Sequence, residues 1–207
     1  MDGPKLQDRI SRGMGVAARK LGIPFIIYRP TGSVNPISSR NRIIRLFASF
    51  NAQDETYRRV SGYGQALWWG VYDSSYSQPG DYLVGKTQTF FVSAQRPILP
   101  VQCVLTNRIV DVVRTSMPVT GGYAGIVDAQ VVPILAGWPA SLLATNPRTN
   151  GSSTETRFGQ WTLLLPRLPL ALEVGDVVTD DLHRSYVIGA AEQSDLGWRI
   201  NVRQVAA

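Results

Sequence analysis

The chain has 207 residues, of which 44% are hydrophobic and 17% are charged, and its mean hydropathy is −0.04. So many apolar residues exclude global disorder and leave room for one large domain or two small ones. No stretch approaches about 18 consecutive apolar residues, so we expect a soluble protein without a membrane span. The single Cys103 excludes an internal disulfide framework, and together with the single His183 it excludes a Cys/His zinc set. We therefore predict no metal and no cofactor.

Positive charge dominates, with 21 Lys and Arg against 15 Asp and Glu and a formal net charge of +6. A basic surface attracts nucleic acid or an acidic protein face. Arginine also pairs bidentately with carboxylates at subunit contacts, so both interpretations stay open. The cations concentrate in the first third of the chain. The residues predicted to face a DNA channel or a neighbouring subunit are Arg40, Arg42, Arg45, Arg58 and Arg59.

The first 22 residues carry the only strong helical pattern. Apolar residues recur at three- and four-residue steps over 5–21, which predicts one amphipathic helix, and Gly22 is a suitable end for it. Gly13 and Gly15 each weaken the helix by roughly 1 kcal/mol relative to alanine, so it needs a packing partner. That partner is either the chain's own β-structure or a neighbouring subunit. The predicted apolar stripe consists of Leu6, Ile10, Met14, Ala17, Ala18 and Leu21.

Beyond residue 22 the pattern predicts a mainly β protein, with short strands that form one or two small barrel or sandwich modules. We divide it into a first β-rich module (23–117), a connecting segment (118–156) and C-terminal β-hairpins (157–207), which could belong to the same barrel. The polar residues 144–156 predict an exposed partner-contact loop, because their composition cannot form a core. The candidate contact residues in this loop are Asn146, Arg148, Asn150 and Ser152.

Two stretches resemble one another. Gly80-Asp81 precedes a short strand, and Phe91 follows eleven residues after the glycine; Gly175-Asp176 and Tyr186 repeat this spacing. Both stretches predict a tight turn and a β-hairpin. Duplication and a shared turn chemistry explain the likeness equally well at this stage.

No catalytic constellation emerges. His183 follows Asp180-Asp181 at a predicted hairpin tip, but no motif places a nucleophile beside it. The string from Gly80 to Thr87 formally matches GxxxxGKT, yet it lies among β patterns and not before a helix. We therefore predict that the chain is not an enzyme. The predicted core of the C-terminal hairpins consists of Trp161, Val177, Tyr186, Ile188, Trp198 and Ile200.

The stretch 161–205 carries a resemblance to a known class. It contains a Trp-led strand that ends in proline, then Gly175-Asp176-Val177-Val178, Tyr186-Val187-Ile188-Gly189 and a closing Gly197-Trp198-Arg199 strand. This layout resembles the small β-rich virion proteins of tailed bacteriophages or prophages that sit between head and tail.

The resemblance implies a structural component of the head–tail connector, head-closure, neck or tail-nozzle type. It implies a homo-oligomeric ring, of six or twelve copies, around a DNA channel in the virion, made in the cytoplasm of the bacterial host. The implied partners are further copies of the chain, portal or adaptor or tail proteins, and double-stranded DNA that passes without sequence-specific reading. No membrane partner is implied.

Two alternatives stay open: a tail or baseplate hub protein, and a nucleic-acid-binding β-barrel module. The second alternative predicts aromatic residues interleaved with basic residues on one exposed face. The stretch that suits it runs from Tyr57-Arg58-Arg59 through Tyr63 to Trp68-Trp69.

Overall fold

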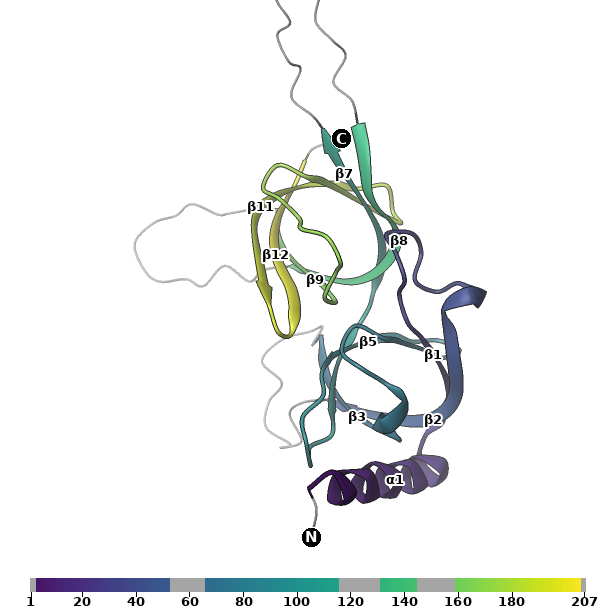
Figure 1. Ribbon diagram of the computed structural model, residues 1–207. Coiled ribbons are helices and arrows are strands. Elements are labelled where there is room, and N and C mark those ends of the chain that lie inside the picture. The colour runs from purple at the N-terminus through teal and green to yellow at the C-terminus, as the bar shows by residue number, and fades with distance from the viewer. Residues whose placement is uncertain (1–2, 53–65, 116–130, 145–158, 206–207) are drawn as a thin grey trace, which may run out of the picture.

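The computed structural model describes residues 3–52, 66–115, 131–144 and 159–205. These residues form one α-helix, twelve strands and two short 3-10 helices, and the strands close into two six-stranded barrels (Figure 1). The predicted fold class is confirmed: the protein is mainly β, with barrel modules and an N-terminal helix. The helix α1 (Gly3–Leu21) lies across the first barrel, on the side away from the second (Figure 1).

The first barrel is an antiparallel sheet closed on itself. Its strands are β1 (Ile23–Tyr28), β2 (Arg42–Ala52), β3 (Leu67–Val71), β4 (Tyr82–Val84), β5 (Thr89–Ala94) and β6 (Val101–Leu105). The 3-10 helices η1 (Ser39–Asn41) and η2 (Ser74–Tyr76) lie in its connections. The strand order is β1-β2-β3-β6-β5-β4, and pairing of β4 with β1 closes the barrel. Apolar side chains alternate inward along the strands, and buried Phe25, Ile27, Leu83, Phe90 and Cys103 form much of its core.

The second barrel repeats this topology strand for strand. It consists of β7 (Arg108–Thr115), β8 (Val131–Ala144), β9 (Gln160–Leu165), β10 (Val177–Asp180), β11 (Ser185–Ser194) and β12 (Gly197–Gln204). Its order, β7-β8-β9-β12-β11-β10, is that of the first barrel with every number raised by six, and β10 pairs with β7 to close it. The chain is therefore a tandem of two barrels with one topology.

This pairing moves the boundary between the two modules. The first barrel ends at Leu105 and the second begins at Arg108, whereas the sequence pattern placed the boundary at residue 117. The segment 118–156, expected to connect modules, contains the fourteen-residue strand β8, and 157–207 supplies only four of the six strands of its barrel. The sequence did not predict β8 as a strand because proline and glycine usually indicate a loop. Pro133 and Gly137 lie where the β7–β8 register shifts, and the Gly137 amide donates to the Asp111 carboxylate at 2.7 Å.

The same turn precedes the fourth strand of each barrel. Gly80 has a φ of 97° and Gly175 a φ of 95°, a left-handed conformation that favours glycine. The following Asp81 and Asp176 are buried, and each accepts two hydrogen bonds from one arginine. Arg29 follows β1 and reaches Asp81 at 2.9 and 2.8 Å, and Arg114 near the end of β7 reaches Asp176 at 2.7 and 2.9 Å. We call each of these pairs an Arg–Asp clamp.

The hairpins that follow the two turns differ by one residue. Four residues separate the paired positions Val84 and Thr89, but five separate Thr179 and Ser185. Tyr186 is therefore equivalent to Phe90, and the equal spacing to Phe91 in the sequence was misleading by one position. The aromatic packing agrees, because Phe90 meets Trp68 and Tyr186 meets Trp161 edge-on, with ring centroids 6.1 Å apart in both barrels.

The second barrel has the predicted C-terminal core, with one exception. Tyr186, Ile188, Trp198 and Ile200 are buried in one cluster, and Trp161 packs against it. Val177 is only half-buried, and its neighbour Val178 is the buried residue. The prediction for Val177 was wrong because β10 enters the barrel one residue later than the Gly-Asp turn suggested.

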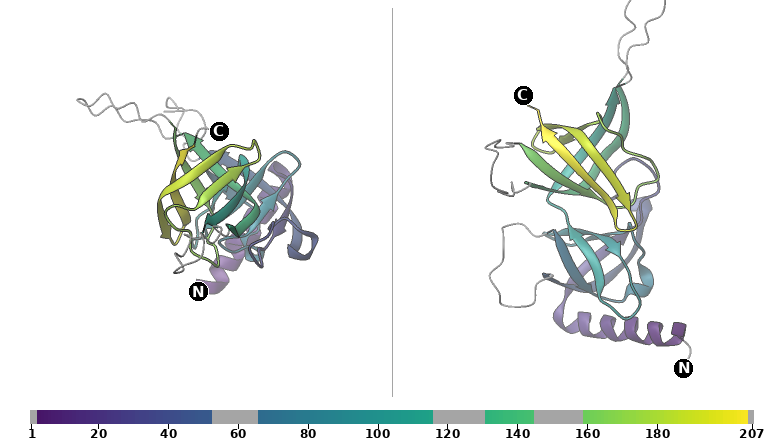
Figure 2. Two further views of the ribbon diagram at one scale, coloured as in Figure 1. Left: turned by 90° about the horizontal axis from the view of Figure 1, so that it is seen from above. Right: turned by 90° about the vertical axis from the view of Figure 1, so that its left-hand side faces the viewer.

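The two barrels pack directly against one another, and the molecule is elongated along the line that joins them (Figure 2). On β4 and β5, Tyr82 and Phe91 point away from their own barrel and join the core cluster of the second barrel. The Tyr82 hydroxyl donates to the Pro139 carbonyl at 2.8 Å, and the Trp138 indole donates to the Ser33 carbonyl at 2.7 Å. Since these contacts bury large aromatic side chains, we treat the two barrels as one body.

Candidate functional site

Three of the five predicted contact arginines lie in the described residues. Arg40 is in η1, and Arg42 and Arg45 are in β2; all three are exposed. None of the three lies in an ion pair with another described residue. Arg58 and Arg59, and the loop residues Asn146, Arg148, Asn150 and Ser152, lie outside the described residues, as do Tyr57 and Tyr63.

The surroundings of Arg45 are apolar. Its strand neighbours on the outer face of β2 are Ile43, which is 47% exposed, and Phe47, which is 44% exposed. On the adjacent β1, Pro24 pairs with Phe47 and Ile26 pairs with Arg45. An arginine among exposed aliphatic and aromatic side chains is the composition of a protein-contact surface. We call this surface the outer β1–β2 face; its apolar residues distinguish it from the basic surface of α1, which is described next.

The helix α1 carries most of the remaining free cations of the N-terminal half. Its outer face presents five exposed basic residues: Lys5, Arg9, Arg12, Arg19 and Lys20. At about 100° per residue, the five fall within an arc of about 100° around the helix axis. The one acidic residue of the described helix, Asp8, pairs with Arg12 at 2.9 Å, where both side chains are well exposed. We call this set the α1 cationic face.

A different face of α1 holds it on the first barrel. Ala18 is fully buried, and the Ser11 hydroxyl lies 3.0 Å from that of Ser74 in η2. A methyl group on Gly15 would lie 2.9 Å from the Cβ of Asp73, so this glycine permits the close approach. Small residues therefore make the closest contacts, and among them only Ala18 belongs to the apolar stripe expected from the sequence.

The predicted stripe is only partly covered. Ala18 is buried, but Leu6 is 40% and Leu21 is 78% exposed. The rest of the stripe, Ile10, Met14 and Ala17, is half-buried. Apart from Ala18, which belongs to both, the stripe lies beside the contact, because Ser11, Gly15 and Ala18 bring the two backbones too close for larger side chains between them.

The two halves of the molecule differ sharply in charge. Residues 3–52 and 66–105 contain eleven Lys and Arg but three Asp and Glu, whereas residues 106–115, 131–144 and 159–205 contain six and seven. Four of the six arginines in the second set lie in ion pairs with nearby carboxylates: Arg108, Arg114, Arg184 and Arg199. The excess positive charge of the described residues thus belongs entirely to α1 and the first barrel.

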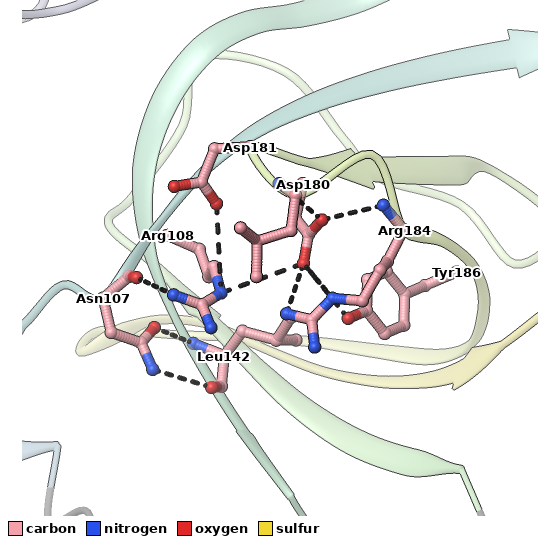
Figure 3. A network of polar contacts seen from close by, with 8 residues as sticks. Asn107, Arg108, Leu142, Asp180, Asp181, Arg184 and Tyr186 are labelled. Atoms are coloured by element: carbon pink, nitrogen blue, oxygen red, sulfur yellow. Dashed lines mark hydrogen bonds and ion pairs between the residues drawn. The ribbon is translucent and has the colours of Figure 1, made fainter.

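The second barrel holds a dense polar network at the β10–β11 hairpin (Figure 3). The buried Asp180 carboxylate accepts from the Arg184 guanidinium at 2.8 and 2.6 Å, from the Tyr186 hydroxyl at 3.2 Å, and from two backbone amides. Arg108 approaches it to 3.8 Å. Burial acts to raise the pKa of Asp180, but the hydrogen bonds and charge of Arg184 prevail and lower it. Asp180 is thus the ionised centre of a structural network and not part of a solvated turn.

His183 has no part in that network through its side chain. It is exposed, has a left-handed φ of 59°, and its backbone amide donates to the Asp180 carbonyl. The GxxxxGKT string lies at the β4–β5 hairpin, so that Lys86 and Thr87 form an exposed tip between strands. Neither arrangement assembles a reactive group with a phosphate cradle or a nucleophile.

Cys103 is fully buried in the first barrel, and burial raises the pKa of its thiol far above the ordinary value. Among the described residues, no three His, Cys, Asp or Glu side chains gather in a group that could hold a metal ion. In the same part of the chain, no helix is both long enough and apolar enough to cross a membrane.

Sequence reasoning missed the α1 cationic face as a unit, although its signal was present. The basic residues at positions 5, 9, 12 and 19 have helical spacing, and plotting them around the helix axis places them together. It also missed the Arg–Asp clamps, because 52 residues separate Arg29 from Asp81 and 62 separate Arg114 from Asp176. No local pattern predicts such distant partners.

Comparison with protein-family models, with curated proteins and with solved structures gives no match to this chain. The arrangement of its own residues therefore carries the functional argument.

Proposed function

We propose that this chain is a structural subunit of a tailed-bacteriophage or prophage particle, and that its copies form a ring at the head–tail junction around the DNA. The observation that carries the proposal is the charge division between the two ends of the molecule. A basic end suits proximity to a polyanion, and an end whose charges are internally neutralised suits packing among proteins. The sequence resemblance to connector, head-closure, neck and nozzle proteins supports the same assignment.

A closed ring needs two different contact faces on each subunit, because its interfaces are heterologous. The molecule offers chemically distinct surfaces for this purpose. The outer β1–β2 face combines Arg45 with exposed Ile43 and Phe47, and the Gln160–Gln204 half of the second barrel carries paired charges such as Arg199 with Glu192. The first of these faces is the more suitable core of a subunit contact, since apolar and aromatic surface drives association.

The oligomeric state in solution tests this proposal. Light scattering coupled to size-exclusion chromatography, followed by negative-stain imaging, should find a discrete closed ring of identical copies. The variant Ile43→Lys/Phe47→Lys should reduce the ring to smaller species while circular dichroism stays unchanged. The matched control Ile98→Lys/Leu99→Lys alters two exposed apolar residues between β5 and β6, outside both of these faces, and should leave the ring intact.

A monomer that binds DNA would overturn the ring and favour a nucleic-acid-binding β-barrel module. Against that module stands the position of Trp68, which is partly buried and packs against Phe90 and the core of the first barrel. A ring located by antibody labelling at the distal end of the tail would instead favour a tail or baseplate hub protein.

A further inference from the structure

We propose that the α1 cationic face is the surface through which this chain contacts the phosphate backbone of double-stranded DNA. The inference deepens the proposed function and rests on it for the identity of the polyanion. It differs from the expectation from sequence, which assigned a DNA channel or a subunit contact to Arg40, Arg42 and Arg45 without choosing between them.

The length and charge of the face fit a duplex. From Lys5 to Lys20 the helix rises about 22 Å, at about 1.5 Å per residue. Double-stranded DNA carries one charge per ~1.7 Å of axis, so this length of duplex presents more than ten phosphates. The five cations of the face are met by one described carboxylate on the same helix, that of Asp8. An exposed ion pair of this kind is worth little, and Arg12 can exchange it for a phosphate.

The composition of the face disfavours a protein partner. Protein interfaces have an apolar centre and are depleted of lysine, but the apolar residue that lies among these cations is Val16, 56% exposed. The outer β1–β2 face, with Arg45 between Ile43 and Phe47, has the opposite composition. The two basic surfaces of the first half thus suit two different partners, DNA at α1 and protein at β1–β2.

The packing of α1 disfavours a membrane surface. An interfacial helix inserts the apolar face that lies opposite its basic residues. In this chain Ser11 and Ala18 lie away from the cations, and both are buried against the first barrel. The apolar residues opposite the cations are Met14 and Ala17, which are half-buried, and Leu21, which is exposed at the end of the helix. Only Leu6 and Leu21, near opposite ends of α1, are thus exposed behind the basic residues, and two separated leucines do not form a continuous face for insertion into a bilayer.

The same packing holds the cations in a fixed array. Gly15 lies against Asp73 and Gly22 lies against the Ala48 carbonyl, and neither contact has room for a side chain, so the helix is closely packed on the barrel at both points. The helix lies at the end of the elongated molecule, across the first barrel from the second (Figures 1 and 2). Its outer face is therefore open to a partner as large as a duplex.

The test compares two charge-matched variants of the full chain. The first is Lys5→Gln/Arg9→Gln/Arg19→Gln/Lys20→Gln, which removes four cations of the face. The second is Lys86→Gln/Arg96→Gln/Arg167→Gln/Arg203→Gln, which removes four exposed cations that lie in no ion pair with another described residue. Both variants have the same net charge, so a difference between them reports the location of the cations and not their number.

Binding of a random-sequence 30-base-pair duplex is measured by fluorescence anisotropy between 50 and 200 mM salt. Five phosphate contacts predict that wild-type affinity falls roughly 500-fold over this range, with a log–log slope of about −4.5. The α1 variant should lose about three to four units of slope, so that its remaining affinity falls only roughly fourfold. The control variant should keep the wild-type slope.

Several outcomes would overturn the inference. One is an α1 variant that keeps the wild-type slope, and another is a control variant that loses as much slope as the α1 variant. A wild-type chain that binds phosphatidylglycerol vesicles or polyglutamate more tightly than the duplex would also exclude it. If a ring forms but binds no duplex, this inference is rejected and the proposed function is retained. If a monomer binds DNA through α1, this inference is retained and the ring of the proposed function is rejected.

Discussion

The two barrels share a topology and a clamp, but they differ at the tip of the hairpin that follows the clamp. Pairing with β1 and with β7 shows that Gly85 and Asp180 occupy equivalent positions, four residues after Asp81 and Asp176. In the first barrel a Cβ on Gly85 would lie 2.6 Å from the ring of Phe25. In the second barrel the residue equivalent to Phe25 is Val110, which pairs with Asp180 and leaves room for its side chain.

This difference distinguishes features that the turn backbone requires in both barrels from a feature that depends on the size of the neighbouring core residue. The left-handed glycine and the buried aspartate occur in both barrels because the turn needs them. The polar network at Asp180 occurs in the second barrel alone, because a smaller core residue admits a carboxylate there. The clamp variants are therefore made in both barrels, and the Gly85 variant is judged against the equivalent position in the second barrel.

The largest expected effect is the loss of either clamp. Arg29→Gln and Arg114→Gln each leave a buried aspartate without its charged partner, since Asp81 and Asp176 have side chains only 1% and 2% exposed. We expect each change to lower the free energy of unfolding by about 2–4 kcal/mol. Urea denaturation measures both, and a clamp that can be removed at no cost would show that the two barrels do not close in the same way.

A second, smaller effect concerns Gly85. The change Gly85→Ala should cost about 1–3 kcal/mol, because the new methyl group meets the Phe25 ring. In the background Phe25→Val, which imitates Val110, the same change should cost at least about 1 kcal/mol less. A double-mutant cycle measured by thermal melting gives this coupling. Equal costs in both backgrounds would contradict the steric explanation.

Acid should weaken the second barrel through its two buried carboxylates. Burial acts to raise the pKa of Asp176 and Asp180, but hydrogen bonds from Arg114 and Arg184 prevail and lower both. A lowered folded-state pKa stabilises the fold fully above the unfolded value of about 3.9, and this stability is lost as the pH falls through the folded value.

The destabilisation caused by Asp180→Asn should therefore be greatest above about pH 5 and shrink toward pH 3. Urea midpoints of wild type and variant over this range measure the difference. A cost that stays constant with pH would show that Asp180 does not act through its charge.

The smallest effect is expected at His183. Its side chain is exposed and accounts for none of the hydrogen bonds of the hairpin tip, so His183→Ala should change stability by less than about 0.5 kcal/mol. His183→Val should cost more, because a β-branched residue resists the left-handed φ of 59°. If alanine and valine destabilise the chain equally, the left-handed φ does not determine the cost of a substitution at residue 183.

Local patterns in the sequence predicted local structure well. The helix near 5–21, the two Gly-Asp turns and most strands follow from the period of apolar residues and from turn chemistry. The strand β8 escaped because Pro133 and Gly137 are signals of a loop, and only pairing with β7 allows them in a strand. The division into modules was wrong for the same reason, since β7 and β8 cannot be assigned to a barrel until their partners are known.

The candidate site was predictable only in composition. A basic N-terminal third was evident, but its separation into an α1 cationic face and an apolar surface around Arg45 depends on which side of each element packs inward. Ser11, Gly15 and Ala18 decide this for α1, and of these only Ala18 contributed to the hydrophobic pattern of the sequence.

The clamps also bear on the order of folding and on the lifetime of the folded chain. Each clamp holds the place where a barrel closes, between its first and its fourth strand, and its partners are 52 or 62 residues apart. Contacts of such long range form late, after the intervening hairpins, because their loop-closure entropy is large. An interaction that is absent from the folding transition state slows unfolding without slowing folding. Two late-closing ion pairs are therefore expected to lengthen the life of the native state, as the proposed particle subunit would need once it has folded.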